Sequence, residues 1–106
     1  MEFKEIIKRA VDIKKKYAEL EKEKYGKLWT KEQNVQGFVT DVGELMELVM
    51  AKEGVKEIND VDEKLAHELA DCLYSLLVIA NGYGVDIEDS FLKTMDELEK
   101  RIEKDN

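Results

Sequence analysis

Apolar residues recur every three or four positions along most of this chain, which is the spacing of one face of an α-helix. In a first segment, from about Phe3 to Lys24, lysine and glutamate occupy most positions between the apolar ones. The apolar face of that segment consists of Phe3, Ile6, Ile7, Ala10, Val11, Tyr17 and Leu20. We expect this helix to end at Gly26, because glycine readily takes the left-handed conformation that follows many helices.

Two polar tetrads predict the starts of the second and third helices. Thr30 and Gln33 fit a capping box, in which each side chain bonds the backbone N–H of the other residue. Asp60 and Glu63 repeat that pattern before the third helix. The second helix is expected to continue to about Lys52. Its apolar stripe consists of Val35, Phe38, Val39, Val42, Leu45, Met46 and Val49.

The third helix is expected to run to about Asn81, where Gly82 and Gly84 interrupt it. Asp86 then fits the capping position of a fourth helix. The apolar face of this fourth helix consists of Ile87, Phe91, Met95, Leu98 and Ile102. The chain contains no proline, and the connections between its helices are short, which favours antiparallel neighbours. We therefore predict one all-α domain over residues 1–106, built as a four-helix bundle.

Composition narrows the possible partners and location of the chain. A chain of 106 residues buries a modest core, so association into a homodimer or homotetramer would add buried area. The net charge of −8 argues against a nucleic-acid polymer, because basic side chains must replace counterions there. Cys72 is the only cysteine, which excludes an internal disulfide and favours a reducing compartment. Without signal-peptide character or an apolar run near the roughly 20 residues of a membrane span, we expect a cytoplasmic protein with no membrane partner.

The third helix carries carboxylates in a setting that requires a partner. From Leu69 to Ala80 it is apolar nearly all round, so it is expected in a core. At about 100° per residue, Glu68, Asp71 and Ser75 line one narrow stripe of this helix. A buried carboxylate costs several kcal/mol unless it is neutralised, paired or ligated. A metal ion, a buried basic side chain or protonation would each satisfy Asp71.

The second helix offers a similar pair, Glu44 and Glu47, on the side away from its apolar stripe. Taken alone, that side is a solvated face, and acids three apart are common in a chain with 25 acidic residues. Two helices that each present carboxylates at i and i+3 can nevertheless converge on a point between them. Four such carboxylates suit hard cations such as Mg²⁺ or Mn²⁺. Surface ion pairs and solvent remain the alternative interpretation.

The two acidic motifs, Glu44-x-x-Glu47 and Glu68-x-x-Asp71, resemble those of the MazG family of all-α nucleoside triphosphate pyrophosphohydrolases. Members of that family carry E-x-x-E, a spacer of moderate length and then E-x-x-D; here 20 residues separate the motifs. Gly43 and the apolar run after Asp71 add to the similarity. The resemblance covers the second and third helices well and the fourth loosely.

This resemblance implies a helical bundle in which Glu44, Glu47, Glu68 and Asp71 hold Mg²⁺, with Mn²⁺ as a possible substitute. It also implies hydrolysis of a (d)NTP between the α and β phosphorus atoms, which yields a nucleoside monophosphate and pyrophosphate. Mg²⁺ would offset the charge of the triphosphate, so an acidic protein could still bind this substrate. A carboxylate beside the metal, Glu44 or Glu47, would accept the proton of the attacking water.

The fourth helix matches the family less closely. Members often carry a lysine, an asparagine and an arginine there that reach the phosphates. Lys93 and Arg101 fit two of these positions, whereas Leu98 stands where the asparagine is expected. Both cations also fit an ordinary helix surface. Trp29 or Tyr25 offers a ring on which a nucleobase could stack, although packing against the bundle is the simpler role.

Two other functions also fit these residues. Phosphoribosyl-ATP pyrophosphatase has a related helical fold, and residues 74–77 and 84–89 look similar to it, but that family usually has paired glutamates where this chain has Glu44 and Leu45. A non-catalytic helical interaction protein, with its acids on solvated faces, is the alternative from another class. Divalent metal should raise the melting temperature of either enzyme but not of the interaction protein.

Overall fold

The computed structural model describes residues 1–105, and these residues form four α-helices without a strand. In chain order the helices are α1 (Phe3–Tyr25), α2 (Lys31–Lys52), α3 (Val61–Gly82) and α4 (Ile87–Asp105). The predicted all-α class is therefore confirmed, and the expected helix ends lie within a residue or so of the observed ones. The local periodicity of apolar residues was thus enough to predict where these helices lie.

Polar side chains cap two of the helices as predicted, but the side chain expected to cap the third helix does not do so. The capping box before α2 is confirmed: the Gln33 N–H donates to Thr30 Oγ1 at 3.1 Å, and the Thr30 N–H donates to Gln33 Oε1 at 2.9 Å. Before α4, Asp86 Oδ1 accepts the N–H of Asp89 at 3.1 Å. The capping role predicted for Asp60 is wrong. Its backbone is left-handed, with φ 56°, and its side chain makes no capping bond, because a capping side chain reaches the helix N–H groups from an extended backbone.

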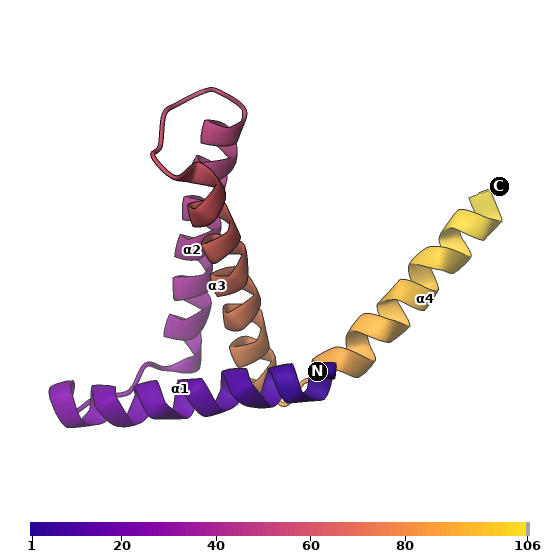
Figure 1. The fold of residues 1–106 in the computed structure, drawn as a ribbon. Helices are drawn as coiled ribbons and strands as arrows, with labels where there is room; N and C mark the ends of the chain where they lie inside the picture. Colours follow the sequence, from indigo (N-terminus) through magenta and orange to yellow (C-terminus); the bar gives the residue numbers. More distant parts are fainter. Residues whose placement is uncertain (106) are drawn as a thin grey trace.

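Helices α2 and α3 run antiparallel and side by side, as a helical hairpin (Figure 1). Two polar contacts fix how the helices align. Ser75 Oγ donates to Asp41 Oδ2 at 3.3 Å, and Lys52 Nζ lies 2.6 Å from Asp62 Oδ1. Five of the six buried apolar side chains of the described residues belong to this hairpin, and the sixth, Ala10, belongs to α1; the five are Leu48, Cys72, Leu77, Val78 and Ala80.

Helix α1 crosses the foot of the hairpin and packs on α3 (Figure 1). Its buried residue is Ala10, whose small side chain allows the two helices to approach closely. Gly26 ends the helix as predicted: its φ is +69°, and its N–H donates to the carbonyl of Lys22 at 2.9 Å. Among these residues no helix is both long and apolar enough to cross a membrane.

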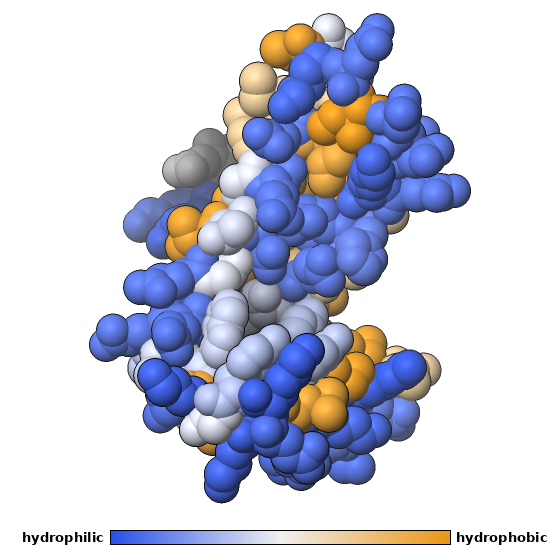
Figure 2. All heavy atoms as spheres, turned by 90° about the vertical axis from the view of Figure 1, so that its left-hand side faces the viewer, coloured by the Kyte–Doolittle hydropathy of each residue, from blue (hydrophilic) through white to orange (hydrophobic). Residues whose placement is uncertain are grey.

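Helix α4 extends away from the other three helices (Figure 1). The short connection before it therefore does not bring it back alongside α3, although such connections favour antiparallel neighbours. Its apolar residues Phe91, Leu92 and Ile102 remain exposed. The Cα radius of gyration is 17.1 Å, compared with about 13 Å for a compact domain of 100 residues. Apolar side chains also reach the surface between the charged ones elsewhere on the molecule (Figure 2).

Candidate metal centre

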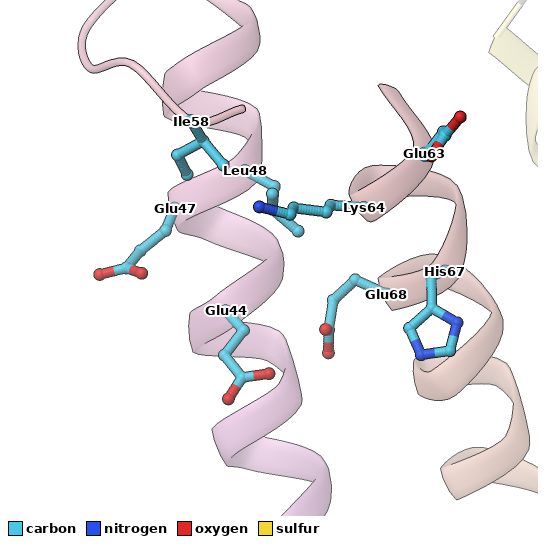
Figure 3. Close-up of a pocket in the computed structure, with 8 residues that line it drawn as sticks. All are labelled: Glu44, Glu47, Leu48, Ile58, Glu63, Lys64, His67 and Glu68. Carbon is cyan, nitrogen blue, oxygen red and sulfur yellow. The ribbon is translucent and has the colours of Figure 1, made fainter. Parts of the chain in front are cut away.

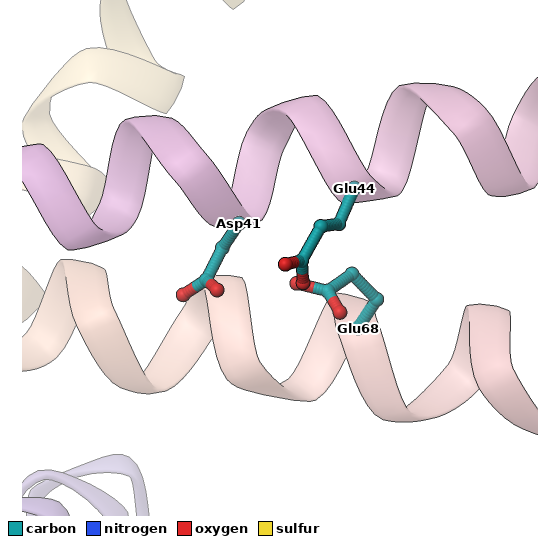
Figure 4. Close-up of side chains that lie close together, drawn as sticks. All are labelled: Asp41, Glu44 and Glu68. Carbon is teal, nitrogen blue, oxygen red and sulfur yellow. The ribbon is translucent and has the colours of Figure 1, made fainter.

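Three carboxylates converge between α2 and α3. Asp41 and Glu44 come from successive turns of α2, and Glu68 comes from the facing side of α3 (Figure 4). One oxygen of each carboxylate lies within 4.8 Å of the others, so these three residues could hold a metal ion together. The spacing explains the convergence, because residues three apart share a helix face and the hairpin turns that face towards α3.

Glu68 is the unusual member of this group. It is 7% exposed, and its Oε1 has no hydrogen-bond partner within the described part of the chain. Burial raises the pKa of Glu68, and the negative charges of Glu44, Asp41 and Asp71 raise it further. An ionised carboxylate in this position is costly unless a proton or a cation compensates it. The group is therefore built around a side chain that lacks a positive partner.

Asp41 was not among the sequence-based candidates. Its hydroxyl donor, Ser75, lies on the same stripe of α3 as Glu68, and the Ser75–Asp41 bond holds the Asp41 carboxylate in the group. The signal in the sequence was the spacing Asp41-x-x-Glu44, which is the same as that of Glu44-x-x-Glu47 but one turn earlier. Only the alignment of α2 with α3 distinguishes the two pairs.

Glu47 lies outside the three-residue group, at its rim. Its side chain is 62% exposed and lies 3.7 Å from Lys56 Nζ. Figure 3 shows the Glu47 carboxylate directed away from Glu68, whereas Glu44 and Glu68 point towards the same space. All three nevertheless line one cavity of about 480 Å³, which α2 and the start of α3 enclose. Glu47 is thus close enough to contact a molecule held by the other two.

Asp71, one turn beyond Glu68, also lies beside the group without joining the three oxygens. Its Oδ2 is 3.3 Å from His67 Nε2, on the partly exposed side of α3. Its charge contributes to raising the pKa of Glu68, which places it within electrostatic reach. The structure therefore brings Glu44 and Glu68 together with Asp41, and leaves Glu47 and Asp71 around them.

The two cations proposed for phosphate contacts lie on α4. Lys93 Nζ is 2.9 Å from Asp89 Oδ2, one turn earlier on the same helix, and this ion pair raises the pKa of Lys93. Arg101 lies two turns further on. Because α4 extends away from the hairpin, neither side chain is brought beside the acidic group within this chain (Figure 1).

A second cavity, of about 380 Å³, adjoins the acidic group on the side of α1. Trp29, Asn34 and Asp41 are among its lining residues, so an indole ring and a carboxylate of the group share one space. The ring lies against Gly37: a Cβ atom there would be 3.1 Å from Trp29 Cζ3. Lys14 Nζ lies 5.8 Å from the centroid of the same ring. This arrangement places an aromatic surface beside the carboxylates.

The donor set fits a hard divalent cation. Carboxylate oxygens are the ligands that Mg²⁺ and Mn²⁺ prefer, and two or more of them beside an open cavity leave room for water or phosphate oxygens. The unpartnered oxygen of Glu68 points to a ligand more directly than the spacing of the acids does. Cys72, next to the group on α3, is buried, and burial raises the pKa of its thiol, so a soft thiolate ligand is not favoured.

Comparison with known proteins gave one result. The family model described as MazG nucleotide pyrophosphohydrolase domain matches residues 29–104, which include α2, α3 and nearly all of α4. Neither curated proteins nor solved structures gave a significant match. The matched region contains all the acidic residues discussed above, and it includes Trp29 but not α1.

Proposed function

This chain belongs to the MazG nucleotide pyrophosphohydrolase domain family, and from that premise we propose that it hydrolyses a nucleoside triphosphate between the α and β phosphorus atoms. Water supplies the oxygen of the new bond, and the products are a nucleoside monophosphate and pyrophosphate. The observation that carries the proposal is the buried carboxylate of Glu68, whose Oε1 has no hydrogen-bond partner within the described residues, beside Asp41 and Glu44. Such a group is suited to a divalent cation, which a triphosphate substrate also requires.

In this proposal Glu68, Glu44 and Asp41 hold Mg²⁺, or Mn²⁺ in its place, with Asp71 and Glu47 close by. The bound ion would neutralise phosphate charge and stabilise the charge that develops during cleavage. Ser75 fixes the orientation of Asp41 through its hydroxyl. Removing the negative charge of any one of these acids should therefore weaken metal binding.

The remaining roles follow from position around the group. Glu44 or Glu47 accepts the proton of the attacking water; Glu47 is suited to this because it lines the same cavity but lies outside the three-oxygen group. Trp29 stacks on the nucleobase, because its ring and Asp41 line one cavity. A base held there would extend its phosphates towards the acids.

We also propose that the working form is a homodimer or homotetramer and that it is cytoplasmic. Lys93 and Arg101 remain candidates for phosphate contacts. Since α4 extends away from the acidic group of its own chain, these cations would act on a site of another copy (Figure 1). The whole of residues 1–106 then acts as one domain.

The reaction is tested by mixing the protein with individual triphosphates and Mg²⁺ and measuring pyrophosphate and orthophosphate separately. We expect pyrophosphate, with turnover abolished in Glu44→Gln and Asp71→Asn while helix content is unchanged. Glu53→Gln, an exposed carboxylate change at the end of α2, is the matched control. Unchanged turnover in both site variants would refute the assignment. Including phosphoribosyl-ATP among the substrates separates the related pyrophosphatase, and no turnover with any substrate would favour an interaction protein.

A further inference from the structure

The cavity of about 480 Å³ beside the acidic group contains basic side chains as well as acids. Its charged lining residues are Glu44, Glu47, Glu63, Lys64, His67 and Glu68. Of the two basic side chains, His67 lies beside a carboxylate, with its Nε2 3.3 Å from Asp71 Oδ2. Lys64 makes no ion pair with any carboxylate that the structure describes. The cavity therefore holds an ammonium group that is available to an anion.

Lys64 reaches into this cavity from near the start of α3. It lies one turn before Glu68, and residues four apart share one face of a helix. Figure 3 shows the Lys64 side chain extending from α3 towards α2, as the Glu68 side chain also does. Helical side chains lean towards the N-terminal end of their own helix, so the ammonium group lies on the side of Glu68 that is nearer the start of α3.

Along the hairpin, Lys64 and Trp29 lie on opposite sides of the acidic group. The cavity that Trp29 lines opens at the level of Asp41. Along α2, Glu44 follows Asp41 by one turn, and Leu48 follows Glu44 by another. Leu48 and Lys64 line the same cavity, so Lys64 lies at this further level. The order along the hairpin is therefore an aromatic surface, the acidic group and then the lysine.

A nucleoside triphosphate presents its chemical groups in a matching order. The inference rests on the hydrolysis proposed above, in which the base stacks on Trp29 and a divalent cation lies at the acidic group. The phosphates that are furthest from the base then extend towards Lys64. A triphosphate keeps negative charge after one divalent cation has bound, so its far end needs a further positive charge. Lysine supplies such a charge to phosphate as a compact ammonium group.

We propose that Lys64 binds the β and γ phosphates of the substrate, which leave together as pyrophosphate. Lys93 and Arg101 do not supply this charge within the chain, because α4 extends away from the acidic group (Figure 1). Lys64 is already in the cavity that Glu44 and Glu68 line, and no ion pair with a described residue has to break before it binds phosphate. Its charge would offset the negative charge of the leaving pyrophosphate.

Calorimetric titration of the full chain with inorganic pyrophosphate, at saturating Mg²⁺, tests the proposal. We expect the Kd for pyrophosphate to rise about tenfold or more in Lys64→Gln, the loss of one charge-assisted contact, and to stay near the wild-type value in Lys64→Arg. Lys15→Gln, a change at another exposed lysine on α1, is the matched control and should bind as the wild type does. A nucleoside monophosphate lacks the β and γ phosphates, so its Kd should be the same in Lys64→Gln as in the wild type.

Titration with Mg²⁺ alone separates a phosphate contact from a structural role. Lys64→Gln should bind Mg²⁺ at least as tightly as the wild type, because the removed charge repels the ion. Equal losses of pyrophosphate and monophosphate affinity would overturn the proposal, as would an unchanged Kd for pyrophosphate in Lys64→Gln or no pyrophosphate binding by the wild type. Triphosphate turnover by the wild type with unchanged pyrophosphate binding in Lys64→Gln refutes only the role of Lys64. Pyrophosphate binding that depends on Lys64, without turnover of any triphosphate, refutes only the proposed hydrolysis.

Discussion

The two sides of the α2–α3 hairpin are built from neighbouring residues and have opposite requirements. On one side Asp41, Glu44 and Glu68 bring negative charge together, and none of the ion pairs among the described residues involves them. On the other, aliphatic side chains such as Val42 and Leu73 are exposed to solvent. A rotation of about 100°, one residue along each helix, separates the two sides.

The hairpin therefore combines a buried carboxylate that needs a compensating charge with apolar side chains that are exposed to water. On the acidic side, a proton or a cation would compensate the buried carboxylate, because an uncompensated charge in a partly buried space is costly. The exposed apolar side chains have the opposite requirement, because apolar area is stabilised by removal from water. The two needs are separable, and each can be tested while the other is left intact.

The largest expected effect is on the acidic side. Glu68→Gln keeps the size of the side chain but removes the charge that would hold the ion. Since a bound metal contributes several kcal/mol to stabilising charge, kcat should fall by more than about a hundredfold. Steady-state pyrophosphate release measures this, with circular dichroism to verify the helices. Near-normal turnover would show that the acidic side is not the catalytic one.

Metal binding should stabilise the folded chain. At a hundredfold excess of Mg²⁺ over Kd, the free energy of unfolding should rise by about 2.7 kcal/mol, or several degrees in Tm per kcal/mol. Thermal melts at fixed protein concentration, with and without the ion, give the shift. Glu68→Gln should remove it, whereas Leu20→Glu should retain it. An equal shift in Glu68→Gln would place the ion elsewhere.

A smaller effect distinguishes which turn of α2 completes the ion site. Asp41→Asn should weaken Mn²⁺ binding by about 10- to 100-fold, by analogy with the loss of residues that support a metal site. Glu47→Gln should weaken it less, because the Glu47 carboxylate is exposed and lies near Lys56. Calorimetric titration of both variants gives the two affinities. A larger loss of affinity in Glu47→Gln than in Asp41→Asn would indicate that Glu47, and not Asp41, is the ligand.

The pH dependence of stability offers a test of Glu68 without metal. Its folded-state pKa is raised above the ordinary 4.5, mainly by burial. The folded state therefore holds that proton more tightly, so the contribution of Glu68 to stability is fully present below the ordinary value and is lost as pH rises through the folded pKa. Urea denaturation between pH 5 and 7, without metal, should show this fall in the wild type and less of it in Glu68→Gln. If the free energy of unfolding fell equally with pH in the wild type and in Glu68→Gln, a proton on Glu68 would not be what compensates its burial.

The smallest effect concerns Gly43, which lies between the exposed Val42 and Glu44 of the acidic group. No atom lies within 4 Å of a Cβ built there, so Gly43→Ala should raise the free energy of unfolding by about 1 kcal/mol. Gly37→Ala is the matched change, and it should gain less because its Cβ would be 3.1 Å from Trp29 Cζ3. Urea denaturation compares the two. A destabilising Gly43→Ala would mean that the assembled protein covers this position.

Local features of the fold were predictable from the sequence. The Thr30–Gln33 box and the end of α1 at Gly26 depend on residues within one turn of each other, so their sequence signals are sufficient. Asp60 was misjudged because the connection before α3 imposes a left-handed backbone, which its side chain does not reveal. The sequence placed Glu68 and Asp71 on one stripe of a nearly apolar helix but assigned the buried carboxylate to Asp71; the structure leaves Asp71 partly exposed and buries Glu68 instead.

What the sequence determined by itself is the set of four helices and the presence of a carboxylate that must be compensated, because both follow from the residues of a single helix. The tertiary structure alone decided that Asp41 joins Glu44 and Glu68, and that α4 leaves its apolar side exposed. The physical reason is the alignment between helices. If α2 slid along α3 by one residue, different side chains would face each other in the space between the two helices. The periodicity within one helix does not determine this alignment.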